Sequence, residues 1–130
     1  MNHFSTKILI IENEIIIALD LGLQCTKLGY DVIGIQTSAE DAFRSINIQR
    51  PNLVIMNIGR KEKALGLKSA RGILDELRVP LILISSYTDK ETFKQLIDLN
   101  PYAFISKPFK TEHLKKGIET ALFRMNLEDH

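Results

Sequence analysis

Polar side chains that could do chemistry follow short apolar runs in this sequence. These polar positions are Glu12-Asn13, Asn57, Ser85-Ser86 and Lys107. A short apolar run bounded by turn-forming residues predicts a strand buried on both faces, and ligands bind beyond the carboxyl ends of such strands in open parallel sheets. We therefore expect these side chains to meet at one edge of a sheet, where the hydroxyls and the lysine could bind a phosphate.

Asn57 stands where a reactive group is expected, directly after the apolar run 53–56. Its amide is nevertheless a poor nucleophile and carries no charge. A purely structural asparagine that caps a loop is the alternative interpretation. The position favours an active site whereas the residue type disfavours catalysis, and this conflict governs every functional interpretation of the chain.

Common catalytic and nucleotide-binding motifs are missing from the sequence. It contains no Gly-x-Gly-x-x-Gly, no Gly-x-x-x-x-Gly-Lys-Ser/Thr and no Gly-x-Ser-x-Gly. The histidines, His3, His113 and His130, lie away from the predicted sheet edge. These observations disfavour dinucleotide binding, nucleoside triphosphate binding and hydrolase chemistry, so we expect that the protein is not an enzyme.

The composition predicts one ordinary globular domain over residues 1–130, with no output domain. Hydrophobic residues make up 45% of the chain and charged residues 25%, which is typical of soluble proteins. The net charge of +1 provides no field that would attract nucleic acid or a membrane surface. The single cysteine, Cys25, excludes an internal disulfide and lacks the partners of a zinc site. Without a signal peptide or a membrane span, a cytoplasmic protein is expected.

Five apolar runs alternate with five helical patterns along the chain. Strands are predicted near residues 7–11, 32–35, 53–56, 81–84 and 102–105. Because these runs are continuous rather than alternating, they indicate a parallel sheet covered on both faces. Right-handed crossovers then produce an α/β three-layer sandwich.

The helix predicted over residues 15–28 carries two apolar stripes. Ile16, Leu19 and Leu23 form the stripe that we expect to cover the sheet. A second set lies on nearly the opposite face: Ile17, Leu21, Cys25 and Leu28. Part of the second set packs on the last helix or, alternatively, the set forms an exposed patch for a partner or a dimer.

Four segments in order resemble the receiver (CheY-like) domain of bacterial two-component response regulators. They are residues 10–14, 53–58, 84–89 and 104–109, so the resemblance covers about residues 6–125. Each segment alone is a weak match, whereas four of them at successive strand ends make a specific one. The resemblance implies a flavodoxin-like (βα)5 fold with the strand order 2-1-3-4-5 and a cis Lys107-Pro108 bond.

In such receivers an acidic pair at the place of Glu12 and Asn13, with the carbonyl of Gly59, helps to hold Mg²⁺. The residue at the place of Asn57 is an aspartate, which accepts a phosphoryl group from a histidine kinase and also contacts the metal. The resemblance further assigns Ser85 and Lys107 to contacts with the phosphoryl group. It makes Phe104 an aromatic switch that changes rotamer.

The sequence departs from this pattern at Asn57 and Asn13. An amide at the acceptor position cannot form an acyl phosphate. Mg²⁺ prefers sites with one or two carboxylates, so Glu12 with neutral amides is expected to bind it only weakly, and no cofactor is required. With two carboxylates gone, we expect Lys107 to pair with Glu12 if its side chain reaches that far. Ser85 and Lys107 then have either a structural role or a retained anion-binding role, and Phe104 is either a core residue or a switch.

Two hypotheses follow. The first is a degenerate receiver that acts through protein–protein contacts, by its fourth helix, fifth strand and fifth helix or as a homodimer. Its partner would be a histidine kinase, an output domain or another signalling protein. The second is a flavodoxin-like domain that binds a nucleotide or phosphate with Ser85, Ser86, Lys107 and the basic loop 59–63, although that loop can equally be a solvated surface segment.

Overall fold

The computed structural model describes residues 6–59, 61–86 and 90–128. Its five strands are β1 (Lys7–Ile11), β2 (Asp31–Gln36), β3 (Leu53–Ile58), β4 (Leu81–Ser85) and β5 (Ala103–Ser106). All neighbouring pairs are parallel and the order across the sheet is β2-β1-β3-β4-β5, with β3 at its centre. The predicted flavodoxin-like sandwich and its strand order are confirmed.

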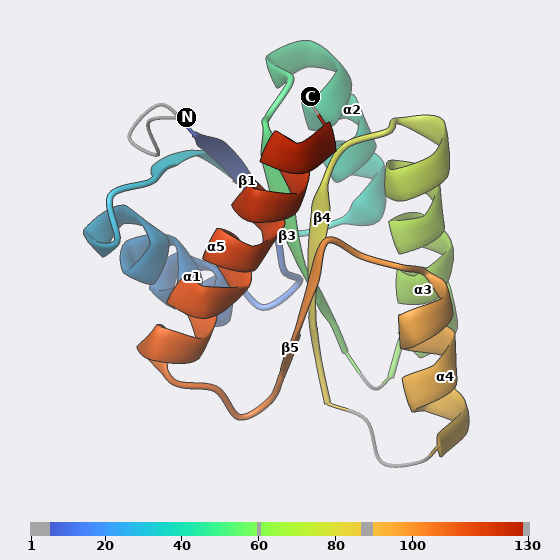
Figure 1. Ribbon diagram of the computed structural model, residues 1–130. Helices are drawn as coiled ribbons and strands as arrows, with labels where there is room; N and C mark the ends of the chain where they lie inside the picture. Colours follow the sequence, from blue (N-terminus) through green and yellow to red (C-terminus); the bar gives the residue numbers. More distant parts are fainter. Residues whose placement is uncertain (1–5, 60, 87–89, 129–130) are drawn as a thin grey trace.

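Helices cover both faces of the sheet (Figure 1). Their bounds are α1 (Ile15–Lys27), α2 (Ala39–Gln49), α3 (Lys63–Arg71) with its π-helical continuation η2 (Gly72–Glu76), α4 (Lys90–Asp98) and α5 (Thr111–Glu128). Residues of α1 and α5 pack on one face of β1, β3 and β4, and residues of α2, α3 and α4 pack on the other. The two apolar cores hold the carboxyl ends of the strands at one edge.

Local sequence signals explain where several helices begin and end. Ser38 caps α2 by accepting a hydrogen bond from the Asp41 backbone N–H at 3.2 Å. Gly29 follows α1 with a φ of 98°, the left-handed conformation that favours glycine after a helix. The Lys107-Pro108 peptide bond is cis, as the resemblance implies.

The predicted orientation of α1 is wrong. Ile16, Leu19 and Leu23 are 75%, 50% and 60% exposed, whereas Ala18, Leu21, Gly22 and Cys25 are the buried residues of the helix. The small residues explain this orientation, because a Cβ on Gly22 would lie 3.5 Å from Ile35 Cδ1, so this face approaches the sheet closely. The set expected to pack on the last helix supplies Leu21, Cys25 and Leu28 to the core shared with α5.

Candidate functional site

Four of the polar residues predicted to meet lie together at the carboxyl edge of the sheet, whereas Ser85 and Ser86 do not line the same hollow. Glu12 and Asn13 follow β1, Asn57 is the fifth residue of β3, and Lys107 follows β5. They line a hollow of about 270 Å³, hereafter the edge hollow, together with Gly59 and Lys61. Arg60, from the basic loop, lies outside the described residues.

The centre of this site is a hydrogen bond between Asn57 and Glu12. The Asn57 Nδ2 donates to Glu12 Oε2, and the backbone N–H of Glu14 donates to Glu12 Oε1 at 2.9 Å. The register explains the first contact, because Ile11 pairs with Met56 across β1 and β3 and the next residues are therefore neighbours. Glu12 is only 2% exposed, so its carboxylate is buried with both oxygens hydrogen-bonded.

The Asn57 amide is oriented by the charge of its neighbour. An ionised carboxylate only accepts hydrogen bonds, so the amide nitrogen must face Glu12. The amide oxygen, Oδ1, is then left buried without a hydrogen-bond partner. An unsatisfied buried acceptor costs about 1–3 kcal/mol, which the charge-assisted bond to Glu12 offsets. Asn57 therefore does not cap a loop; it links two strands.

The prediction that Lys107 pairs with Glu12 is wrong. Among the described residues, the ion pairs within 4.0 Å do not include either side chain. Lys107 is half-buried and lines the edge hollow, but the Asn57 amide and the Glu14 N–H already bond to both Glu12 oxygens. Asn57 thus forms the contact with Glu12 that was expected of the lysine.

The other two residues named by the resemblance lie apart from the edge hollow. Ser85 is 3% exposed, and its hydroxyl donates to the carbonyl of Ser86 at 3.1 Å. Phe104 is half-buried and packs against the core on the α2, α3 and α4 side. Neither side chain lines the hollow formed around Asn57.

The donor set does not fit Mg²⁺ well. Glu12 is the one carboxylate among the expected ligands, and both its oxygens are hydrogen-bonded. Within the described ranges, no three His, Cys, Asp or Glu side chains are grouped so that they could hold a metal ion. Asn13, Asn57 and Gly59 could offer neutral oxygens only, whereas Mg²⁺ in proteins relies on carboxylates and substrate phosphates.

A link between α3 and α4 was not anticipated from the sequence. Lys63 belongs to the basic loop expected to be solvated, yet its Nζ donates to Thr92 Oγ1 at 2.7 Å. Thr92 lies in the first turn of α4 and is 4% exposed. The ammonium therefore connects the start of α3 to the start of α4, beside the sheet edge.

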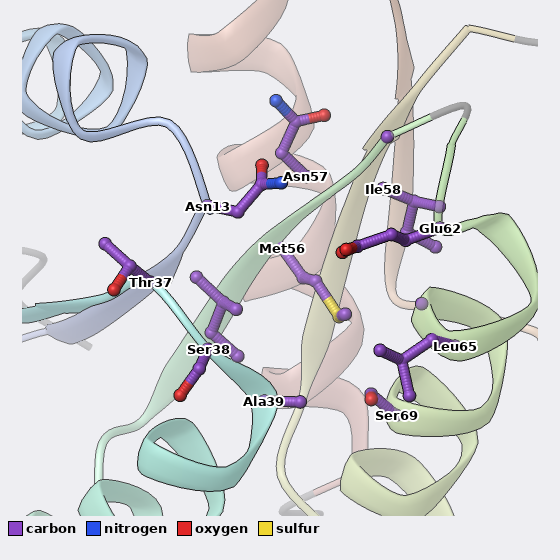
Figure 2. A pocket seen from close by; sticks show the side chains of 13 residues that line it. Asn13, Thr37, Ser38, Ala39, Met56, Asn57, Ile58, Glu62, Leu65 and Ser69 are labelled. Atoms are coloured by element: carbon purple, nitrogen blue, oxygen red, sulfur yellow. The ribbon is translucent and has the colours of Figure 1, made fainter.

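A second cavity, hereafter the α2–α3 cavity, was also not anticipated (Figure 2). It lies between the start of α2 and the start of α3 and measures about 300 Å³. The α3 side contributes Glu62, Leu65, Gly66 and Ser69, whose spacing of i, i+3, i+4 and i+7 is the sequence signal for this wall. Four residues line both this cavity and the edge hollow: Asn13, Asn57, Gly59 and Glu62.

Cys25 is a packing residue. It is fully buried in the core between α1 and α5, and burial raises the pKa of its thiol to about 12. A thiol that stays protonated is a poor nucleophile.

No helix among the described residues is long and apolar enough to cross a membrane.

Comparisons with known proteins agree with this fold. The family model of the response regulator receiver domain matches residues 8–119. The Phyllosphere-induced regulator PhyR of Methylorubrum extorquens is 32% identical over 120 residues, which are 92% of this chain and 44% of the relative. The transcriptional regulatory protein PdtaR of Mycobacterium tuberculosis is 25% identical over 118 residues, which are 91% of this chain and 57% of the relative.

A solved structure is similar over nearly its whole length. The signal receiver domain of a modulated diguanylate cyclase from Desulfovibrio desulfuricans G20 is 31% identical, with a TM-score of 0.81, 95% of this chain covered and 98% of that one. The chain spans about half the length of the curated relatives that it matches. The family match, together with the parallel sheet and the polar edge, shows that this chain belongs to the response regulator receiver domain family of two-component systems.

Proposed function

We propose that this protein is a receiver domain that does not accept a phosphoryl group and that signals through protein–protein contacts. The observation that carries the proposal is the Asn57–Glu12 hydrogen bond. Phosphoryl transfer to a receiver needs a carboxylate oxygen as nucleophile at residue 57. Here the residue is an amide, and its oxygen is buried.

The surroundings of Asn57 also lack what phosphoryl transfer needs besides a nucleophile. Metal ions neutralise the charge that develops on a transferring phosphoryl group. The carboxylate that would help to bind such an ion, Glu12, is engaged by two hydrogen-bond donors. The hydroxyl of Ser85 donates to a backbone carbonyl beside it rather than into the edge hollow. These contacts favour a signalling role without catalysis.

Exposed apolar surface supports a role in protein contacts. On α4, Phe93 and Ile97 are large and exposed, and a groove of about 390 Å³ runs along β5 and α5. Phe104 lines this groove, so it connects the strand to the proposed contact surface. We place the partner protein, a histidine kinase, an output domain or another signalling protein, on the surface of α4, β5 and α5. A homodimer through the exposed stripe of α1 is a second contact mode.

Incubation with acetyl phosphate and Mg²⁺, followed by intact-mass spectrometry, tests the proposal. The wild-type chain is expected to show no added phosphoryl group. The doubly substituted variant Asn13→Asp/Asn57→Asp restores the acidic residues and serves as the matched positive control. A hydroxylamine-sensitive phosphoryl adduct on residue 57 of the wild-type chain would overturn the proposal.

The nucleotide- or phosphate-binding hypothesis has less support. Lys107 lines the edge hollow, but Ser85 does not, and the hollow also contains Glu12, Glu14 and Glu62. Those carboxylates repel an anion. Thermal-shift measurements with nucleotides, flavins and inorganic phosphate test this hypothesis, and we expect no stabilisation by any of them.

A further inference from the structure

The α2–α3 cavity contains the hydroxyl of a largely buried serine, and this hydroxyl is open to the cavity. Ser69, on α3, is only 7% exposed, and the structure gives its hydroxyl no hydrogen-bond partner among the described residues. A serine within a helix commonly bonds to a backbone carbonyl of the preceding turn, as Thr120 does with the carbonyl of Lys116. Figure 2 shows that the Ser69 oxygen is directed into the cavity instead. The Ser69 hydroxyl is therefore available to a molecule that enters the cavity.

A carboxylate is directed into the same cavity. Glu62 precedes α3, and Figure 2 shows its side chain extending across the cavity toward Met56. Among the described residues that line the cavity, Glu62 carries the sole charge, and it forms no ion pair within the described part of the chain. The neighbouring Lys63 is directed away, to Thr92. The cavity is therefore a negatively charged pocket.

The rest of the wall near these two groups is apolar. Met56 forms the floor, Leu65 lies between Glu62 and Ser69 on α3, and Ala39 lies opposite on α2. Gly66 lets α3 pack closely against β3, because a Cβ at this position would lie 2.9 Å from Ile58 Cγ2. A volume of about 300 Å³ suits a small ligand, and pockets of this kind combine apolar walls with a few convergent polar groups.

We propose that the α2–α3 cavity binds a small organic ammonium ion. The ammonium group would donate hydrogen bonds to the Glu62 carboxylate and to Ser69 Oγ, and its alkyl part would pack against Met56 and Leu65. An anion would be repelled by Glu62. A divalent metal ion would find one carboxylate where it needs several. A water molecule could bond to Ser69, and water also solvates the exposed Glu62 carboxylate, but water would leave the apolar wall uncovered.

This site adjoins the edge hollow, and Asn13, Asn57, Gly59 and Glu62 line both, whereas Ser69 and Leu65 line the α2–α3 cavity and not the edge hollow. The proposal does not depend on whether residue 57 can be phosphorylated. It uses Glu62 and Ser69, which the acetyl phosphate experiment does not test. The shared wall means, however, that binding should be detectable at the Asn57 side-chain amide.

An NMR titration of the full chain tests the proposal. ¹H–¹⁵N spectra are recorded with butylammonium chloride, benzylammonium chloride, sodium butyrate and butan-1-ol, at constant ionic strength. Saturable shifts are expected with the ammonium ions at residues 39, 62, 65 and 69. Butyrate and butanol should give none. The Glu62→Gln variant should bind about tenfold more weakly, because a charge-assisted hydrogen bond becomes a neutral one.

Two further variants keep the test specific. Ser69→Ala should weaken binding about threefold, since it removes one neutral hydrogen bond. Glu76→Gln, at the far end of η2, should bind as the wild-type chain does. The proposal is overturned if neither ammonium ion gives saturable shifts, which would leave an ordered water only. Equal shifts with butyrate or butanol, or full affinity in Glu62→Gln, would overturn it as well.

Discussion

The two halves of the sheet edge use their polar residues differently. On the β1–β3 half, Glu12 and Asn57 are joined by a hydrogen bond in a buried setting. On the β4–β5 half, Lys107 forms no ion pair within the described ranges and Ser85 bonds to its own neighbour. The β1–β3 half is therefore the more tightly connected one.

This difference shows that residue identity alone does not report function. Ser85 and Lys107 lie at the strand ends where the resemblance places phosphoryl-binding groups, yet Ser85 bonds to a backbone carbonyl and does not line the edge hollow. Glu12 is hydrogen-bonded to Asn57. The stability of the β1–β3 half should therefore depend on its polar contacts, whereas that of the β4–β5 half should depend on them much less.

The largest expected effect comes from Asn57→Asp. The substitution places a second carboxylate against the buried carboxylate of Glu12 and removes the amide donor. Uncompensated buried charge should lower the free energy of unfolding by about 3 kcal/mol at pH 7. Urea unfolding measures this loss, and Asn47→Asp, at an exposed position of α2, is the control. Unchanged stability would show that the Asn57–Glu12 hydrogen bond contributes little to the free energy of unfolding.

The substitution Glu12→Gln should have the next largest effect. It removes the charge and leaves the Asn57 amide with a neutral acceptor, and we expect a loss of about 1–2 kcal/mol in the free energy of unfolding. The same urea experiment applies, with Glu14→Gln as a neighbouring control whose side chain is exposed. A gain in stability would mean that the desolvation of Glu12 outweighs its hydrogen bonds.

Ser85→Ala should have a smaller effect. Its hydroxyl is buried, but the hydrogen bond is to the adjacent Ser86 carbonyl. We expect a loss of about 0.5–1 kcal/mol, typical of one neutral hydrogen bond. Thermal unfolding followed by circular dichroism measures the change. A loss of stability as large as that of Asn57→Asp would mean that polar contacts stabilise the two halves of the sheet edge equally.

Lys107→Met should have almost no effect on stability. The side chain keeps its length and its apolar stem, and the structure shows no ion pair for the ammonium to lose among the described residues. The change in the free energy of unfolding should stay within about 0.5 kcal/mol. If urea unfolding shows a larger loss of free energy, Lys107 has a stabilising contact, and polar contacts also stabilise the β4–β5 half.

Much of the fold could be predicted because the strands are continuous apolar runs. Their parallel order and the place of Asn57 at a strand end follow from those runs and their polar boundaries. The orientation of α1 could not be predicted from its large apolar residues. Ala18 and Gly22 decide it, because small side chains let the helix approach the sheet. Exposed Ile16 and Leu23 are the consequence.

The meeting of Glu12 and Asn57 could be predicted, but their bond could not. It depends on the register that places residue 12 beside residue 57, and pairing with Lys107 was the more obvious electrostatic choice. The α2–α3 cavity was missed for a similar reason. The spacing of Glu62, Leu65 and Ser69 is visible in the sequence, whereas the gap between two helices is a property of the packed structure.

The Asn57 side-chain amide offers the most direct test of the account. Its two ¹H–¹⁵N signals can be followed while Mg²⁺ and then acetyl phosphate are added to the wild-type chain. The account predicts that the signals keep their positions and their slow exchange with water, because the amide stays bonded to Glu12. Large shifts or rapid exchange on adding Mg²⁺ and acetyl phosphate, accompanied by shifts in α4, would contradict a closed, phosphoryl-independent site.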